Sequence, residues 1–303
     1  MVSNNPYKMP TAENVTSMES LLYFTWEREV VRIAKENGHA FPWTADPVIS
    51  KYKFTNIHRR HDRVSQWIIK EIIEPNVRDH YLWFVLLVAR LINWPPTLQA
   101  LLREGALPCH PRDFDSVAFS NIIEDYRSRW PKAYSGAYMV YPTKRDPGGY
   151  KSAALATYII KPAAEMHEEI CDAIESEYIS NFVTELSKSF GISTFMAGQV
   201  AADLTYAEGH LADAADLYSY APIGPGSSRG LNYLRGRKPF AEWSQDDFNQ
   251  NLIAINHKIA GELEITDLTL HDVQNVMCEF SKYCRFVLGE GAPKSLYKPE
   301  TEF

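Results

Sequence analysis

The sequence predicts a mainly α-helical protein, and three observations lead to this class. Apolar residues recur at helical spacing through most of the 303 residues, whereas signals for extended chain are confined to one region. Serine, threonine and glycine stand where helices would start and stop. Hydrophobic residues make up 45% of the chain, and no repeat or clear linker interrupts it. A folded protein with one interwoven core is therefore expected.

The expected helices follow one another along the chain. Thr16 and Glu19 form a capping-box pattern, and the helix after them runs to Gly38. Further helices are expected near residues 57–73, 77–93, 113–129, 162–188, 193–207, 245–259 and 269–288. The region 135–160 combines aromatic residues, a Gly-Gly pair and prolines. It is predicted to form a short extended, β-type insertion around a loop.

Composition excludes several classes of protein. A net charge of −7 argues against a protein coated in nucleic acid, although a local anion site remains compatible with it. None of the four cysteines lies in a C-x-x-C pair, which argues against a disulfide framework or a cysteine zinc site and favours a reducing, intracellular compartment. The apolar run 81–92 is broken by Arg90 and is too short for a bilayer, so no membrane partner is expected.

A glycine-rich turn, "IGPGSSRG", stands in a stretch that lacks acids, residues 217–241, although the chain as a whole is acidic. A helix beginning near Ser227 would direct free N–H groups at an anion, and Arg229 would add a bidentate contact. The spacing matches neither the P-loop nor the dinucleotide fingerprint. An ordinary helix–helix turn with solvated arginines fits the same residues.

Two further stretches carry candidate charges. In "KYKFTNIHRRHDRVSQWI", helical spacing puts Arg59, Asp62 and Arg63 opposite the apolar face. They form either a solvated surface or a carboxylate held among cations beside a phosphate-bearing ligand. Asp203 instead lies on an apolar helix face. It is either a general base with a raised pKa or an acceptor of backbone N–H groups.

The last expected helix has a polar face opposite its apolar stripe. Asn275, Glu279 and Lys282 lie on this face, where Glu279 and Lys282 could simply form a surface ion pair. Cys278 flanks the same face and is a lesser candidate nucleophile. His271 lies two helical turns from it, too far to activate the thiol.

Four stretches together resemble one family, the alpha-glutamyl/putrescinyl thymine pyrophosphorylases of bacteriophages, which are amino acid:DNA transferases. The stretches are "FTNIHRRHDRVSQWI", "FMAGQVAADL", "IGPGSSRGLNYLRG" and "CEFSKYCRFVLGEG". The resemblance implies a helix-hairpin-helix, DNA-glycosylase-like fold over residues 46–303, with 1–45 as an N-terminal helical extension. Ser281 departs from the acidic residue expected there, which leaves the choice of amine open.

The resemblance also implies a reaction. An amine, either an amino acid or a polyamine, would replace the pyrophosphate of a pyrophosphorylated 5-hydroxymethyluracil in DNA. A separate 5-hydroxymethyluracil DNA kinase would supply the pyrophosphorylated base, in the cytoplasm of an infected bacterial host. The target base would be flipped out of the stack, with Tyr206, Tyr138 or Trp67 as stacking candidates. No cofactor is implied beyond a divalent metal that could accompany the pyrophosphate, and no metal ligands are expected.

Residue roles follow from this reaction, because a leaving pyrophosphate needs cations and an attacking amine needs a base. The catalytic candidates are Asp203, Glu279 and Asp62. The pyrophosphate-binding candidates are Arg59, Arg63 and Lys282. The DNA-binding candidates are Gly224, Gly226, Ser227, Arg229 and Gly230. Two alternatives stay open: a glycosylase, whose carboxylate would come from "EWSQDD", and a non-catalytic DNA-binding phage protein.

Overall fold

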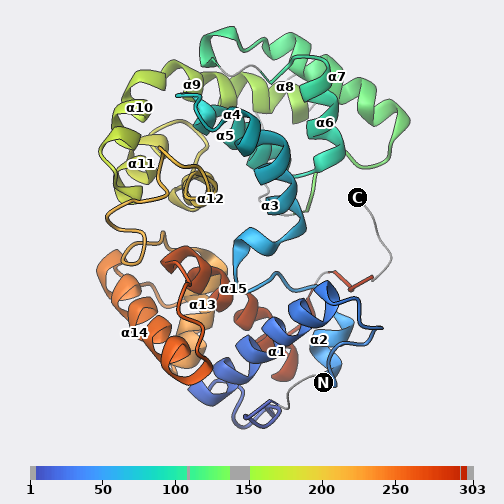
Figure 1. The fold of residues 1–303 in the computed structure, drawn as a ribbon, viewed down its shortest axis with the longest axis vertical. Helices are drawn as coiled ribbons and strands as arrows, with labels where there is room; N and C mark the ends of the chain where they lie inside the picture. Colours follow the sequence, from blue (N-terminus) through green and yellow to red (C-terminus); the bar gives the residue numbers. More distant parts are fainter. Residues whose placement is uncertain (1–4, 108–109, 137–150, 294, 299–303) are drawn as a thin grey trace. The chain divides into compact units, whose positions relative to one another are not determined.

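The computed structural model describes residues 5–107, 110–136, 151–293 and 295–298. The chain divides into two compact units (Figure 1). Unit 1 contains the residues up to Asp62 and those from Tyr218 on, and unit 2 is Arg63–Leu217. The mainly helical class is confirmed, since the described residues contain no strand beyond an isolated bridge between Tyr52 and Leu296.

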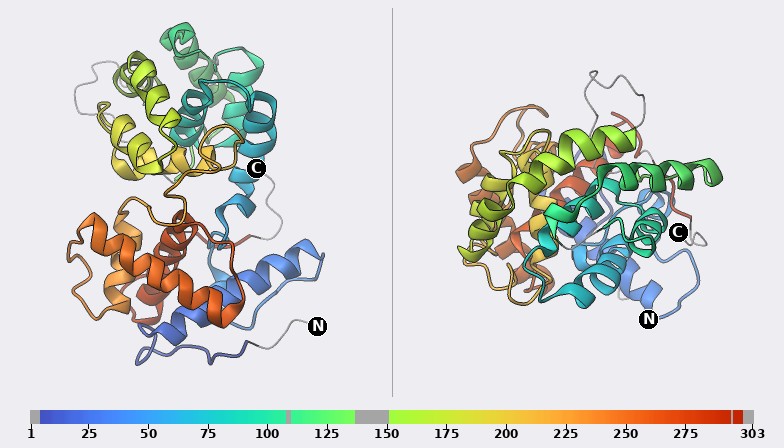
Figure 2. Two further views of the ribbon diagram at one scale, coloured as in Figure 1. Left: turned by 60° about the vertical axis from the view of Figure 1, so that its left-hand side comes forward. Right: turned by 90° about the horizontal axis from the view of Figure 1, so that it is seen from above.

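The described residues of unit 1 form five α-helices and one turn of 3-10 helix. They are α1 (Met18–Glu36), α2 (Pro47–Lys51), the 3-10 turn Arg59–His61, α13 (Pro225–Leu234), α14 (Gln245–Leu263) and α15 (Leu270–Val287). The left view of Figure 2 shows α1, in blue, beside the orange α14, and these helices share one hydrophobic core with α15. Residues 5–45 therefore pack as part of unit 1, and the expected boundary at residue 45 stays a prediction.

A buried carboxylate joins three helices of unit 1. Asp46 is 1% exposed and caps α2 by accepting from the N–H groups of Val48 and Ile49. The hydroxyls of Tyr23 in α1 and Tyr283 in α15 also donate to it, at 3.2 and 2.7 Å. Four donors compensate the burial of the charge. Tyr283 belongs to the stretch "CEFSKYCRFVLGEG", and its hydrogen bond to Asp46 gives it a structural role.

Helix α13 crosses α15 at unusually short range. A Cβ atom added at Gly230 would lie 2.1 Å from the carbonyl oxygen of Met277, and one added at Gly226 would lie 2.3 Å from the sulfur of Cys278. Only glycine permits this approach. The glycine turn is not a short link between two helices, since α12 ends at Leu204 and residues 205–224 follow successive turns before α13.

Unit 2 is assembled around one buried helix. Its elements are α3 (Arg63–Ile68), a π-helical turn Ile69–Ile73, α4 (Glu74–Asn76), α5 (Leu82–Ile92), α6 (Pro95–Arg103), a 3-10 turn Pro111–Asp113, α7 (Ser116–Arg129), α8 (Lys151–Leu155), a π-helical turn Ala156–Ile160, α9 (Lys161–Glu165), α10 (His167–Glu175), α11 (Ile179–Leu186) and α12 (Thr194–Leu204). Every residue of α5 is buried, as its nearly continuous apolar sequence predicts, and α12 packs against it.

The extended insertion expected near 135–160 is wrong for residues 151–160, which are helical. The alanine-rich sequence favours a helix, and a π-helical turn carries it into Pro162. The same arrangement precedes Pro75, where the π-helical turn Ile69–Ile73 runs into α4. Widening the helix before a proline relieves the clash of its ring with the preceding turn. Residues 137–150, including Tyr138, lie outside the described part.

Candidate functional site

The polar face of α15 binds the segment 54–62 in unit 1. Asn275 donates to the Thr55 hydroxyl at 3.0 Å and to the Asn56 carbonyl at 3.1 Å. The Thr55 N–H donates to a carboxylate oxygen of Glu279 at 3.2 Å. These α15 side chains share one face because they are four residues apart. The basic motif is therefore held by the last motif, although more than 200 residues separate them in sequence.

The 3-10 turn of the basic motif is held by the start of α15. The N–H of Arg59 donates to Asp272 at 2.8 Å, and Arg59 itself is only 4% exposed. Asp272 also closes the capping box of α15 with Thr269, so one carboxylate serves both the helix start and the turn. Arg59 is thus a buried cation in a defined position rather than a member of a solvated surface.

Arg28 of α1 is a site cation that sequence reasoning missed. It is 6% exposed and donates to the carbonyls of Thr55 and Phe54, each at 3.2 Å. Burial lowers the pKa of Arg28, while the neighbouring carboxylates Glu279 and Asp62 raise it. The sequence held a signal for it, since a charged residue at this position interrupts the apolar face of the first helix.

Asp62 is the carboxylate with the most perturbed environment in this group. It accepts from the N–H of Asn56 at 2.8 Å. The pKa of Asp62 is raised to about 6, mainly by burial and to a lesser extent by Glu279, against the lowering effects of the Asn56 hydrogen bond, Arg59 and Arg28. The cations favour the ionised form of Asp62, but removal from water has the larger effect on its pKa. At neutral pH the carboxylate is still mostly ionised and is a stronger base than usual.

Glu279 joins a surface cation to the buried segment. It is 4% exposed, and one of its oxygens forms an ion pair with Lys282 while the other accepts from Thr55. The Lys282 side chain is 41% exposed, so its ammonium reaches the surface. The simple surface pair considered from the sequence is therefore only part of the geometry, because Glu279 also anchors segment 54–62.

Cys278 of α15 lies where α13 approaches this helix closely, and its thiol is a weak acid. Burial raises the pKa of Cys278 to about 11, and Glu279 adds to the shift while Lys282, Arg59 and Arg229 oppose it. A thiol with such a pKa is protonated at neutral pH, which argues against a nucleophilic role. Lys282, Arg59 and Arg229 thus all act electrostatically on Cys278, which α13 approaches closely at Gly226.

The glycine turn serves packing and capping in this structure. Gly224 is the N-cap of α13, and the helix starts at Pro225, two residues before the expected position. Ser227 is fully buried, and its hydroxyl accepts from the N–H of Gly224 and donates to its carbonyl. Gly226 and Gly230 face α15. These contacts account for the four residues without DNA, and their DNA-binding role stays a prediction.

Two predicted site residues belong to unit 2. Asp203 is fully buried, and both its oxygens accept from Arg90, one of them at 2.6 Å from Nε. Arg90 also donates to Ser65 at 3.0 Å. This bidentate pair explains the burial of Asp203 without a catalytic task. Arg63 is exposed at the start of α3, and Trp67 and Tyr206 are half-buried.

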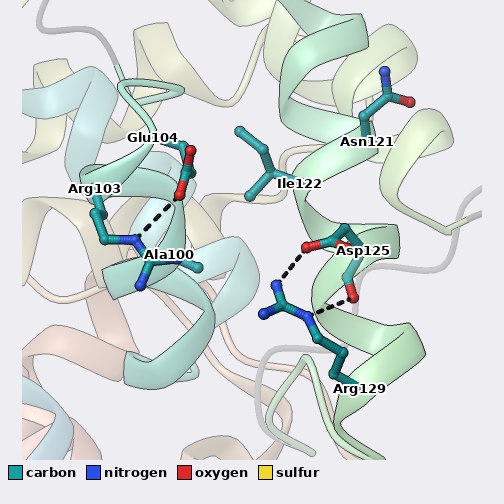
Figure 3. Close-up of a pocket in the computed structure, with 7 residues that line it drawn as sticks. All are labelled: Ala100, Arg103, Glu104, Asn121, Ile122, Asp125 and Arg129. Atoms are coloured by element: carbon teal, nitrogen blue, oxygen red, sulfur yellow. Dashed lines mark hydrogen bonds and ion pairs between the residues drawn. The ribbon is translucent and has the colours of Figure 1, made fainter.

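A hollow of about 300 Å³ lies between α6 and α7 in unit 2 (Figure 3). Arg103 pairs with Glu104 and Arg129 with Asp125 along its walls, and all four side chains are more than half exposed. None of the predicted site residues lines it. Within the described ranges, no three His, Cys, Asp or Glu side chains are grouped to hold a metal ion. No helix of that same part is long and apolar enough to cross a membrane.

Comparison with known proteins gives one family. A family model described as the helical domain of 5-hmdU DNA kinase matches residues 15–292. The chain is 26% identical over 292 residues to a 5-hmdU DNA kinase of Bacillus phage SP10, which covers 88% of this chain and 43% of the relative. The chain thus spans less than half the length of that relative. No solved structure matches it.

Proposed function

Since this chain belongs to the family of the helical domain of 5-hmdU DNA kinases, a family of phage hydroxymethyluracil modification, we propose that it acts on 5-hydroxymethyluracil in DNA. More finely, we propose that it replaces the pyrophosphate of a pyrophosphorylated hydroxymethyl group with an amine and releases pyrophosphate. The observation that carries the proposal is the cluster in unit 1 in which Arg28, Arg59 and Lys282 surround the carboxylates Asp62 and Glu279.

The cations of the cluster suit the leaving group. A pyrophosphate leaves with the electron pair of its C–O bond, and positive charge nearby stabilises the developing anion. Lys282 reaches the surface, where it can meet a phosphate, and Glu279 positions it. Arg59 is buried, and its backbone N–H is held by Asp272. The described residues offer no three-ligand metal site, and no step of the proposal uses a metal ion.

Asp62 suits the incoming amine. A neutral amine attacks the methylene carbon, a C–N bond forms as the C–O bond breaks, and the resulting ammonium must then lose a proton. A carboxylate whose pKa is raised to about 6 is ionised at neutral pH and accepts that proton more readily than an ordinary aspartate. Asp203 is not given this task, because its oxygens already accept from Arg90.

A second candidate follows from the name of the phage SP10 relative, a 5-hmdU DNA kinase. Under it, this chain would help to phosphorylate the hydroxymethyl group itself. The sequence contains no G-x-x-x-x-G-K-[S/T] pattern to hold the phosphates of a nucleotide, and the family match is to the helical domain. The amine transfer is therefore the reaction that the cluster in unit 1 favours.

One experiment separates the two reactions. The protein is incubated with pyrophosphorylated hydroxymethyluracil DNA plus a mixture of amino acids and polyamines, and in parallel with hydroxymethyluracil DNA plus ATP. Nucleoside mass spectrometry should show an amine adduct in the first reaction only. Asp62→Asn should remove the adduct, whereas Arg103→Gln, an exposed change in the hollow of unit 2, should not. Phosphorylated base in the second reaction, with unaltered nucleosides in the first, would overturn the transferase.

A further inference from the structure

The turn between α13 and α14 in unit 1 presents an aromatic ring to solvent. Phe240 is 80% exposed, more than any other large hydrophobic side chain in the described part of the chain. Leaving such a ring in water forgoes about 1.5–3 kcal/mol of burial. The ring is nevertheless not loose, because the guanidinium of Arg229 lies over it, 4.9 Å from its centroid.

The backbone of this turn is held by one buried side chain. Asn232 in α13 is fully buried, and its amide donates to the carbonyls of Pro239 and Ala241 at 3.3 and 2.8 Å. Its side-chain oxygen accepts from the indole of Trp243 at 2.7 Å. Phe240 lies between the two anchored carbonyls. The ring therefore stands on a preorganised turn. A contact residue on such a turn loses little conformational entropy when it binds a partner.

The charges around the ring are positive. Arg229, Arg235, Arg237 and Lys238 lie within twelve residues of the chain, and no acid occurs from 217 to 241. Arg237 is fixed by the Glu242 carbonyl at 2.8 Å and by stacking 3.8 Å over Trp243. A protein with a net charge of −7 thus concentrates cations beside the most exposed aromatic ring among the residues that the structure describes.

We infer that the turn Arg235–Trp243 is a DNA-contacting surface in which Phe240 stacks on, or wedges beside, a base while the neighbouring cations hold the flanking phosphates. Exposed aromatics among arginines are how proteins bind unstacked nucleotides without reading their sequence. The inference rests on the proposed action on DNA, and it names a surface that the charge cluster of Asp62 and Glu279 does not include. An anionic lipid surface is disfavoured because one ring is too little apolar area to anchor a protein.

The test compares Phe240→Ala with Phe190→Ala, which removes a ring that is 56% exposed in unit 2. Binding of the full chain to a fluorescein-labelled duplex containing 5-hydroxymethyluracil is measured by anisotropy at several salt concentrations. Phe240→Ala should bind about tenfold more weakly, equivalent to about 1.4 kcal/mol, with the salt dependence unchanged. Phe240→Trp should restore binding, and Phe190→Ala should bind as the parent does. Lys238→Ala should instead reduce the salt slope by about one.

The outcomes separate this inference from the proposed function. If the parent binds DNA and Phe240→Ala binds equally well at every salt concentration, the surface inference is overturned and the reaction is not. If the parent binds no DNA, both fall. Loss of binding to phosphatidylcholine–phosphatidylglycerol vesicles on Phe240→Ala, with DNA binding intact, would assign the ring to a membrane surface and also overturn the inference. Equal melting temperatures of parent and variant exclude unfolding as the cause.

Discussion

Replacing Gly230 with alanine should push α13 away from α15. The added Cβ would lie 2.1 Å from the carbonyl oxygen of Met277 and 3.0 Å from its carbonyl carbon, whereas ordinary contact begins near 3.4 Å. A backbone carbonyl inside a helix cannot rotate away, so the helices must separate by more than an ångström. Overpacking of this kind costs about 1–3 kcal/mol, and a rigid neighbour favours the upper end. The better helix propensity of alanine returns only about 1 kcal/mol.

We therefore expect Gly230→Ala to lose about 2 kcal/mol of unfolding free energy, measured as a lower urea midpoint by circular dichroism. Gly261→Ala in α14 is the matched control, because its added Cβ meets nothing within 4 Å and its backbone is helical. It should be slightly stabilising. Amine transfer should also fall in Gly230→Ala, since Glu279 lies only two residues beyond the displaced Met277.

Gly226→Ala gives a sharper form of the same argument. Its added Cβ would meet the Cys278 sulfur at 2.3 Å, but the rest of that residue only at 3.4 Å and beyond. Cys278→Ala removes the sulfur, so it should rescue Gly226→Ala and leave Gly230→Ala unrescued. Equal rescue of both glycine variants, or a Gly230→Ala protein as stable as the parent, would refute the close-packing account.

Three further predictions concern the charges. Burial raises the pKa of Asp62 from 3.8 to about 6, so the folded state binds its proton more tightly than the unfolded state. Unfolding free energy should therefore fall as pH rises from about 4 to about 6 and then level off, and Asp62→Asn should remove this slope in pH-dependent urea titrations. Asp203→Leu should lower the unfolding free energy by about 3–5 kcal/mol because it leaves the buried Arg90 without its carboxylate, and adding Arg90→Met should recover most of that loss. An Asp203→Asn variant that is as stable as the parent but inactive in amine transfer would instead indicate that Asp203 is the base. Arg28→Met should disorder segment 54–62, because Arg28 donates to the carbonyls of Phe54 and Thr55. The rate of amine transfer should then fall, as it does in Asp62→Asn. An unchanged rate would show that Arg28 is not part of the site.

The pattern of apolar residues was a sufficient guide to most helices, because a helix that buries one face must repeat every 3.6 residues. The last helix, expected over 269–288, is α15, Leu270–Val287. The first starts one residue late, with Ser17 rather than Thr16 as its N-cap. The prediction fails at 151–160 because glycine and proline commonly break a helix, whereas here a π-helical turn carries the helix into Pro162.

The sequence by itself determined which side chains carry charge and which short motifs they stand in, because composition and spacing are local properties. It identified Arg59, Asp62, Glu279 and Arg229 as candidates. Only the tertiary structure decided that segment 54–62 lies on the polar face of α15 and that Arg28 of α1 binds this segment. It also decided that Asp203 is paired with Arg90 in unit 2. These contacts join residues that are far apart in the chain, and the partner of a buried charge follows from which elements pack together, a property that no local pattern contains.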